Sequence, residues 1–449
     1  MNKTIEIKIN KLGINGEGIG YYNKKICFVP NALPNEVVKA EIVKDNEKFL
    51  DCKLIEIITK SNDRVIPKCK YYEACGGCSL MHLDYEKSLE FKRDLIIESI
   101  KKYTNLNPYS FEIKKVIGME NPYHYRNKSQ LPYQKNKSVV YGIYKANSNI
   151  LVPITNCLVQ REALNDANFH ISRLMDKHHI LPYDKKSRKG CVRYVVVRES
   201  IKTNEMQVTF ILENNKTDLS KFIEDVLKIE NVVSVYTDIN SNLKSNDIFG
   251  NKLTKIKGEN TIKEGLGDFH FSLLPNAFFQ LNPVQTVKLY DCIKKASKLS
   301  GKEVVFDAYC GVGTIGIWVA KNALEVIGVE TNKEAITSAN YNAINNKIKN
   351  ITFICDDVAK QYKMIAKQKN VDVLLLDPPR TGLGSEMCDL ILEHLPKRVV
   401  YTSCNISTFA KDLYVLSKKY NVKYIQPVDM FPQTAHVECV CQLVLKNLL

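Results

Sequence analysis

From about residue 285 onward, short apolar strands alternate with segments of helical periodicity. The expected strands are VVFDAY, EVIGVE, ITFICD, VDVLLLD, RVVYTS and VCQLVLK. A strand that is apolar on both faces has to be covered on both sides, and helices that cross between parallel strands supply that cover. The sequence therefore predicts an α/β fold here, with a parallel sheet between two layers of helices.

The preceding part of the chain has a different pattern. Short strands, TIEIKIN, KICFVP, VVKAEIV and KLIEIIT, alternate with turn residues in the first sixty positions, which predicts a small closed β-barrel. Residues 82–104 have helical spacing, and a mixed α/β region then extends to about residue 275. Because 449 residues are enough for two or three domains, we expect a barrel over 1–60, a central domain over 61–275 and the α/β domain over 276–449, with helix 82–104 packed on the last.

A Gly-rich turn follows the first apolar strand of the α/β domain, in VVFDAYCGVGTIGIWVA. Gly311 and Gly313 allow the backbone to approach a ligand at the carboxyl end of the strand, where open α/β sheets bind ligands. Glu330 ends the next strand, where a carboxylate can accept both hydroxyls of a ribose. The turn lacks the dinucleotide spacing of glycines, and no Walker lysine follows it. A nucleoside without a pyrophosphate fits best, which predicts S-adenosylmethionine.

Asp377 ends another buried strand, VDVLLLD, and is followed by two prolines and Arg380. A side chain so placed faces the same crevice as Gly311 and Glu330. Enzymes that methylate exocyclic amines have an aromatic residue in the equivalent turn, which stacks on the target base. Arg380 stands there in this chain, which disfavours amine methylation and suits contacts to phosphate or carbonyl groups.

Cys404 directly follows the strand RVVYTS, so its thiol is expected at the same edge of the sheet. Carbon 5 of uracil is not nucleophilic enough to accept a methyl group from a sulfonium ion unaided. Addition of a thiolate to carbon 6 produces an enolate whose carbon 5 can attack. The carbon 5 proton must then leave, which requires a general base. Glu438, at the start of the last strand, is the candidate.

Three cysteines with C-x5-C-x2-C spacing, Cys69, Cys75 and Cys78, precede the predicted helix 82–104. The chain has fourteen cysteines and no export signal in MNKTIEIKIN, so we expect a cytoplasmic protein whose thiols bind metal or carry chemistry. Zinc and iron–sulfur clusters both take four thiolates, and this spacing does not choose between them. The fourth ligand has to come from a distant part of the sequence.

Lys and Arg outnumber Asp and Glu by 64 to 49, which suits a polyanionic partner, and no apolar run reaches the roughly 18 residues of a membrane span. Basic residues are dense in KKSRKGCVRYVVVR and around HYRNK, where four tyrosines lie between them: Tyr123, Tyr125, Tyr133 and Tyr194. Such segments hold phosphates while rings stack on unpaired bases. RNA is therefore the expected partner, and a target base has to leave its stack to reach Cys404.

Over nearly its whole length the chain resembles the RNA 5-methyluridine (uracil-C5) methyltransferase family. The matching motifs are YEACGGCSLMHLDYEKSLEFKRD, NPYHYRNKSQ, NAFFQLNP, DAYCGVGTIG, LDPPR, TSCN and DMFPQTAHVE. The first sixty residues resemble the TRAM domain, an OB-like RNA-binding barrel. Asn31 and Asn35 stand where that family usually has glycine, and asparagine is the residue that best tolerates a left-handed backbone after glycine.

The resemblance implies a Rossmann-like S-adenosylmethionine methyltransferase domain, a TRAM barrel and a central α+β iron–sulfur domain. It implies Cys404 as nucleophile and Glu438 as proton acceptor, and it places around the methyl donor Gln280, Tyr309, Thr314, Glu330, Asp357 and Asp377. It also supplies Cys157 as the fourth ligand of a four-iron four-sulfur cluster held by Cys69, Cys75 and Cys78. That cluster is expected to shape the central domain or support RNA binding, without a redox role. One departure is Ile406, where the family commonly has proline.

The substrate is expected to be 23S ribosomal RNA, because barrel and cluster together resemble the ribosomal members of the family. Transfer RNA is the alternative. A cytosine-C5 methyltransferase is disfavoured by the absence of a second Pro-Cys motif and by Glu438. A non-catalytic RNA-binding iron–sulfur protein is disfavoured by the combination of Cys404, Glu438 and the donor turn. No obligate protein partner is implied.

Overall fold

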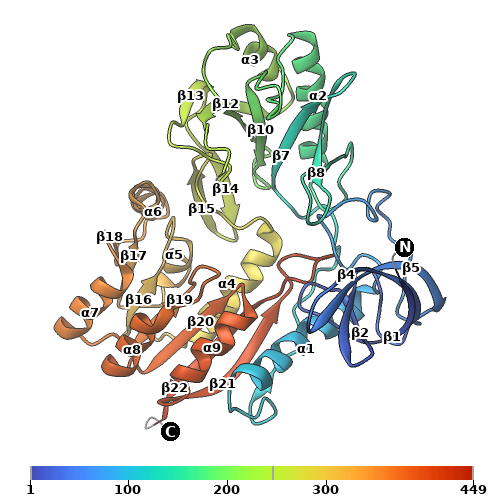
Figure 1. Cartoon of the computed structure of the whole chain (residues 1–449). Coiled ribbons are helices and arrows are strands. Elements are labelled where there is room, and N and C mark those ends of the chain that lie inside the picture. Colours follow the sequence, from blue (N-terminus) through green and yellow to red (C-terminus); the bar gives the residue numbers. More distant parts are fainter. Residues whose placement is uncertain (1–2, 245–246, 447–449) are drawn as a thin grey trace.

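The computed structural model describes residues 3–244 and 247–446, which form three regions (Figure 1). An N-terminal barrel and a central sheet with two helices both adjoin a larger C-terminal region of sheet and helices. In the described part of the chain, no helix is long and apolar enough to cross a membrane.

The N-terminal region is a closed five-stranded barrel with the strand order β1-β2-β3-β5-β4. Along β1, buried isoleucines alternate with exposed polar residues, as expected of a strand with one face in a core. Asn31 and Asn35 have φ angles of 66° and 68°, so the prediction that they replace glycine in left-handed turns is confirmed. The strands are β1 (Thr4–Leu12), β2 (Gly18–Tyr22), β3 (Lys25–Val29), β4 (Val37–Asp45) and β5 (Phe49–Thr59).

The central region is a seven-stranded sheet with the order β13-β12-β11-β10-β7-β8-β9. Two helices, α2 (Glu162–Lys177) and α3 (Ser220–Val226), pack on the sheet and share its core. The strands are β7 (Lys128–Lys135), β8 (Val139–Tyr144), β9 (Leu151–Pro153), β10 (Val192–Glu199), β11 (Met206–Leu212), β12 (Val232–Ile239) and β13 (Thr254–Gly258).

A hairpin of β14 (Ile262–Leu266) and β15 (Phe269–Leu273) joins the central sheet to the C-terminal region. Its apolar side chains belong to the core of that region, where Phe269 lies against Trp318. The hairpin therefore connects the central sheet to the C-terminal region through core packing as well as through the chain itself.

The C-terminal region contains an eight-stranded sheet with the order β18-β17-β16-β19-β20-β22-β21-β6. The five strands from β18 to β20 are parallel, as predicted. The strands are β6 (Glu112–Ile113), β16 (Val304–Ala308), β17 (Glu325–Glu330), β18 (Ile351–Cys355), β19 (Val373–Leu376), β20 (Arg398–Ser403), β21 (Tyr420–Val428) and β22 (Glu438–Leu445). The helices are α4 (Pro283–Ser297), α5 (Thr314–Ala320), α6 (Lys333–Asn345), α7 (Val358–Gln368), α8 (Gly384–His394) and α9 (Ile406–Leu416).

The far side of this sheet differs from the predicted all-parallel arrangement. β22 is antiparallel to both β20 and β21. β21 was not predicted because it is only half-buried over YNVKYIQPV, without the fully apolar run of the central strands. The sheet is therefore mixed, and β22 begins at the edge where the parallel strands end.

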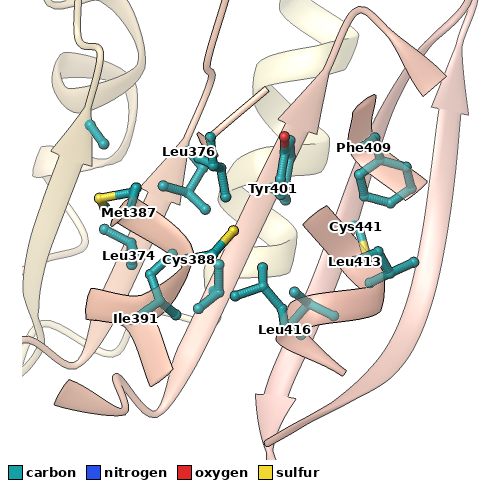
Figure 2. Packing of buried hydrophobic residues seen from close by; sticks show 14 of the residues in the cluster. Leu374, Leu376, Met387, Cys388, Ile391, Tyr401, Phe409, Leu413, Leu416 and Cys441 are labelled. Atoms are coloured by element: carbon teal, nitrogen blue, oxygen red, sulfur yellow. The ribbon is translucent and has the colours of Figure 1, made fainter. Parts of the chain in front are cut away.

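Separate apolar cores cover the two faces of the sheet. Figure 2 shows part of one of them, in which α8 and α9 pack on β19, β20 and β22. Ten of its side chains are labelled: Leu374, Leu376, Met387, Cys388, Ile391, Tyr401, Phe409, Leu413, Leu416 and Cys441. Helices on both faces fix the ends of the strands that carry the candidate site.

Helix α1 (Tyr85–Tyr103) precedes the central sheet in the sequence but packs in the core of the C-terminal region, beside α9. Asp84 caps its N-terminus. Its fully buried Lys92 pairs with Asp429 at 2.5 Å, and the hydroxyl of Tyr85 donates to the same carboxylate at 2.9 Å. This network holds the segment between β21 and β22 against α1.

Candidate active site at the carboxyl edge of the C-terminal sheet

The loop after β16 is shaped by residues in left-handed conformations. Tyr309, Gly311 and Gly313 have φ angles of 62°, 54° and 81°. A Cβ on Gly313 would lie 2.5 Å from the ring of Phe353, whereas a Cβ on Gly311 would meet nothing within 4 Å. Gly313 is thus required by close packing, and the backbone at Gly311 borders open space, which leaves room for a ligand.

The side chains predicted to surround the methyl donor lie just after or at the ends of β16, β17, β18 and β19, at the start of α5, or in the loop before α4. Gln280 is in that loop and is 8% exposed. The hydroxyl of Thr314, the first residue of α5, lies 2.8 Å from that of Tyr290 on α4. Glu330 ends β17, and one of its oxygens accepts hydrogen bonds from Thr331 and Asn332.

Asp357 has a structural role in its own right. It is the N-cap of α7, and its side chain accepts a hydrogen bond from the backbone N–H of Lys360 at 2.9 Å. An exposed capping carboxylate stabilises a helix with or without a ligand. The structure therefore accounts for Asp357 without requiring a contact to the methyl donor.

Cys404 and Glu438 lie on neighbouring strands at the same edge. β20 pairs with β22 so that Ser403 is opposite Cys439, which brings the residue after β20 next to the first residue of β22. Cys404 is half-buried, and Glu438 is 5% exposed. The side chain of Asn405 caps α9 and donates to the backbone oxygen of Arg380 at 2.9 Å, which joins the thiol's turn to the turn after Asp377.

Charged groups at this edge are electrostatically coupled. Burial raises the pKa of the Cys404 thiol, and the carboxylates of Glu438 and Asp377 raise it further, while Arg380 opposes the rise. Burial and Asp377 raise the pKa of Glu438 to about 8, again against the effect of Arg380. Burial alone raises the pKa of Asp377 to about 7. Cys404, Glu438 and Asp377 therefore lie at the ends of three strands in one buried environment that favours their protonated forms.

Asp307 was not predicted as a site residue. It lies inside β16, is 1% exposed, and neither carboxylate oxygen has a well-formed hydrogen bond among the described residues. Burial raises its pKa to about 7, and Asp377 adds to the rise although the nearby N–H of Gly316 opposes it. Its signal in the sequence was an acidic residue within the otherwise apolar run VVFDAY.

These raised pKa values predict that the ligand-free protein loses stability as the pH rises. Asp307, Asp377 and Glu438 titrate in the folded state near pH 7 to 8, above the ordinary range near 4 of an unfolded chain. Between these values the folded state holds more protons than the unfolded state, so its free energy of unfolding falls, by at most about 1.4 kcal/mol per pH unit for each group. We expect Glu438→Gln to melt higher than the wild type, by a margin that grows from pH 5.5 to pH 8.5. A margin independent of pH would contradict this assignment.

The four predicted metal-binding cysteines line one cavity in the central region: Cys69, Cys75, Cys78 and Cys157. Cys157 lies between β9 and α2 and meets the loop of the other three, with Arg126 and Ile143 also in the wall. Burial raises the pKa of the Cys78 thiol, and the other three thiols add to the rise. Within residues 3–244 and 247–446, no three His, Cys, Asp or Glu side chains are close enough to hold a single metal ion.

A glycine-containing turn at the end of the first parallel strand, with a thiol and buried carboxyls at the same edge, is the arrangement expected of an S-adenosylmethionine-dependent methyltransferase. The model of the family described as tRNA (Uracil-5-)-methyltransferase matches residues 84–446, and that of the TRAM domain matches residues 1–55. The chain belongs to this family of RNA uracil-C5 methyltransferases and carries its TRAM barrel at the N-terminus.

Relatives match the chain from end to end. It is 44% identical to an uncharacterized RNA methyltransferase of Bacillus cereus, over 99% of this chain and 98% of the relative. It is 43% identical to one of Listeria monocytogenes, over 98% and 97%. Among solved structures, the tRNA (uracil-54, C5)-methyltransferase of Pyrococcus abyssi in complex with S-adenosyl-L-homocysteine has a TM-score of 0.79 and 29% identity, over 98% of this chain and 100% of that one. The activity is therefore methylation of uracil carbon 5 in RNA.

Proposed function

We propose that this chain methylates carbon 5 of a uridine in 23S ribosomal RNA, with Cys404 as nucleophile and Glu438 as general base. The observation that carries the proposal is the pairing of β20 with β22, which brings these two side chains to one sheet edge. The Cys404 thiolate adds to carbon 6 of the flipped uracil, and the resulting enolate attacks through carbon 5. S-adenosylmethionine supplies the methyl group when it is bound. Glu438 then removes the carbon 5 proton, and the C6–S bond breaks to release Cys404.

Six residues are proposed to bind the methyl donor: Gln280, Tyr309, Thr314, Glu330, Asp357 and Asp377. Among the described residues, both hydrogen bonds to the Glu330 carboxylate, from Thr331 and Asn332, go to Oε1, which leaves Oε2 available to a ligand. That free oxygen suits ribose hydroxyls. Asp377 and Glu438 also suit a sulfonium ion, because a nearby positive charge favours their ionised forms and would lower both raised pKa values. Donor binding would in this way prepare the base for proton removal.

A four-iron four-sulfur cluster is proposed at Cys69, Cys75, Cys78 and Cys157. The four thiols face one cavity, which fits a cluster with four thiolate ligands. The choice of a cluster over a zinc ion rests on the resemblance to the family, because both kinds of site take four thiolates. We propose domain boundaries at about residues 60 and 275, which place this cluster in the central domain. The cluster would connect the N-terminal loop of that domain to the segment before α2.

We expect Cys78→Ser to lower the iron and sulfide content of the purified protein and to reduce its melting temperature, because a lost ligand leaves the loop unanchored. The matched control is Cys191→Ser, which changes a buried cysteine of the same region outside this cavity. Iron and sulfide content equal to the wild type in Cys78→Ser would contradict the ligand assignment. Zinc in place of iron in the wild type would contradict the cluster.

The proposed target can be tested with labelled methyl donor. The purified protein is incubated with unmodified 23S ribosomal RNA and, separately, with unmodified transfer RNA, and the nucleosides are analysed. We expect label in 5-methyluridine from the ribosomal pool. Label from the transfer pool alone would leave the chemistry intact and overturn the proposed target.

Transfer RNA is the second candidate. The support for ribosomal RNA is the combination of barrel and cysteine loop, but the transfer-RNA enzyme of Pyrococcus abyssi matches 98% of this chain. A match of that extent includes most of the barrel, so the barrel alone does not distinguish the two substrates. The two RNA pools therefore have to be compared at equal concentration.

A further inference from the structure

Three basic side chains gather at one end of the central sheet. Lys128 starts β7, and Arg198 lies on β10 directly opposite it in the antiparallel pair. Arg126 precedes Lys128 by two residues, and its Nε donates to the backbone oxygen of Lys128 at 3.1 Å. These three residues are named the cation site below. Like charges placed directly opposite each other destabilise a sheet, so the arrangement needs a compensating charge.

The protein compensates the charge of the cation site only in part: the Glu264 carboxylate acts electrostatically on Arg198, and Arg126 borders the cavity of the four cysteines. Arg198 is 3% exposed, and one of its terminal nitrogens donates to the backbone oxygen of Ala277 at 2.6 Å. The other terminal nitrogen, Nη1, has no partner in the described part of the chain. No ion pair within 4.0 Å involves Lys128 or Arg198 among the described residues. Burial lowers the pKa of Lys128, and the neighbouring Arg198 and Arg126 lower it further.

The carboxylates of Glu199 and Glu264 lie nearby, but their hydrogen bonds and ion pairs are with other residues. Glu199 pairs with Arg161 at 2.8 Å. Glu264 accepts hydrogen bonds from the side chain of Asn127 and from the backbone N–H groups of Ile201 and Gly265. A buried cation is stable only when it is paired or hydrogen-bonded. The cation site is therefore suited to an anion that comes from outside the chain.

The cation site adjoins the proposed methyl-donor residues. Arg198 binds Ala277, which is three residues before Gln280, and the N–H of Asn127 donates to the backbone oxygen of Leu281. In Figure 1 this end of β7 and β10 faces α4 and the catalytic sheet, across the segment after β15. An anion bound here would lie at the junction between the central sheet and the donor loop.

We propose that Lys128 and Arg198, supported by Arg126, bind a backbone phosphate of the substrate RNA close to the target uridine. The proposal rests on the RNA uracil-C5 activity and names a contact that this activity needs. One phosphate oxygen can accept a hydrogen bond from Nη1 of Arg198, and another can accept one from the ammonium group of Lys128. It would also remove the like-charge repulsion between β7 and β10. Phosphate contacts fix the register of a nucleic acid on a protein, so this one would set which nucleotide reaches Cys404.

The test is Lys128→Met, with Lys257→Met as the matched control because Lys257 lies exposed on β13 of the same sheet. We expect Lys128→Met to raise KM for RNA about tenfold at physiological salt, with kcat and the affinity for S-adenosylmethionine nearly unchanged. The slope of log KM against log salt should become shallower by about 0.7, the value for one phosphate on a single strand. Lys257→Met should leave KM and the affinity for the donor nearly unchanged.

A second arm removes the charge from the RNA. In a series of short RNA substrates, one phosphate at a time beside the target uridine is replaced by an uncharged methylphosphonate. At one position the replacement should weaken binding of the RNA to the wild type. The same replacement should not change binding to Lys128→Met. If Lys128→Met instead binds S-adenosylmethionine more weakly and keeps the wild-type slope of log KM against log salt, the proposal is overturned. The cation site would then bind the carboxylate of the methyl donor. Equal losses for both proteins at every linkage would also overturn the proposal.

These results are separable from the proposed function. Formation of 5-methyluridine by the wild type reports on the activity itself, whereas the difference between the two lysine variants reports on the cation site. Should Arg198→Met fail to fold because Arg198 is buried, the half-buried Lys128 still provides the test. Its removal relieves repulsion, so the melting temperature of the RNA-free variant should not fall.

Discussion

Cys404→Ala is expected to abolish methyl transfer, with a fall in kcat of at least about 10⁴-fold. Without the thiol no adduct forms at carbon 6, and carbon 5 stays too weak a nucleophile to attack the methyl donor. The measurement is single-turnover transfer of labelled methyl to a short RNA that contains the target. RNA affinity should stay within about threefold of the wild type, because the missing sulfur acts in the reaction and not in the RNA backbone contacts.

The matched control for this variant is Cys388→Ala, which removes a buried thiol from α8, on one face of the same sheet (Figure 2). We expect it to retain transfer, with a lower melting temperature because a small cavity is left in the core. Substantial transfer by Cys404→Ala would exclude covalent catalysis by this residue. Loss of transfer in both variants would indicate damage to the fold rather than loss of a nucleophile.

Glu438→Gln is expected to accumulate a covalent complex between protein and methylated RNA. Gln cannot accept the carbon 5 proton, so the reaction stops after methyl transfer and before the C6–S bond breaks. Turnover should fall by about 10³-fold, within the range that general bases contribute. The complex should survive denaturing electrophoresis and carry label from the methyl donor.

The double variant Cys404→Ala, Glu438→Gln is the control for this trapped complex, and it should form none. A trapped complex without methyl label would place Glu438 before methyl transfer instead of after it. Normal turnover of Glu438→Gln would assign proton removal to another group at this edge, and Asp377 would then be the first to test, because it shares the environment of Cys404.

The central part of the catalytic sheet was predictable because each of its strands is buried on both faces. β16, β19 and β20 are buried and mainly apolar, with few polar residues between the apolar ones, and the parallel pairing was predicted from that pattern. β21 was not predictable, because a half-exposed strand resembles many other segments. The antiparallel direction of β22 also has no signal in the local sequence, because it depends on where the loop after β21 returns to the sheet.

The candidate site divides in the same way. Cys404 and Asp377 could be placed at the carboxyl edge because each directly follows an apolar strand. Cys157 entered only through the family resemblance, because its partners are about eighty residues away in the sequence. Asp307 and Arg198 were missed as site residues, since an isolated charge in an apolar strand does not reveal whether it has a partner. Pairing of that kind is a property of the three-dimensional structure.

The position of α1 has a consequence for synthesis on the ribosome. Lys92 and its partner Asp429 are 337 residues apart. At about 5 to 20 residues per second, Asp429 is added to the chain roughly 20 to 70 s after Lys92. During that time the apolar side chains of α1, including Ile96 and Ile100, have no catalytic core to join. A nascent chain can therefore complete its barrel early, while the candidate active site can form only after β22 has been made.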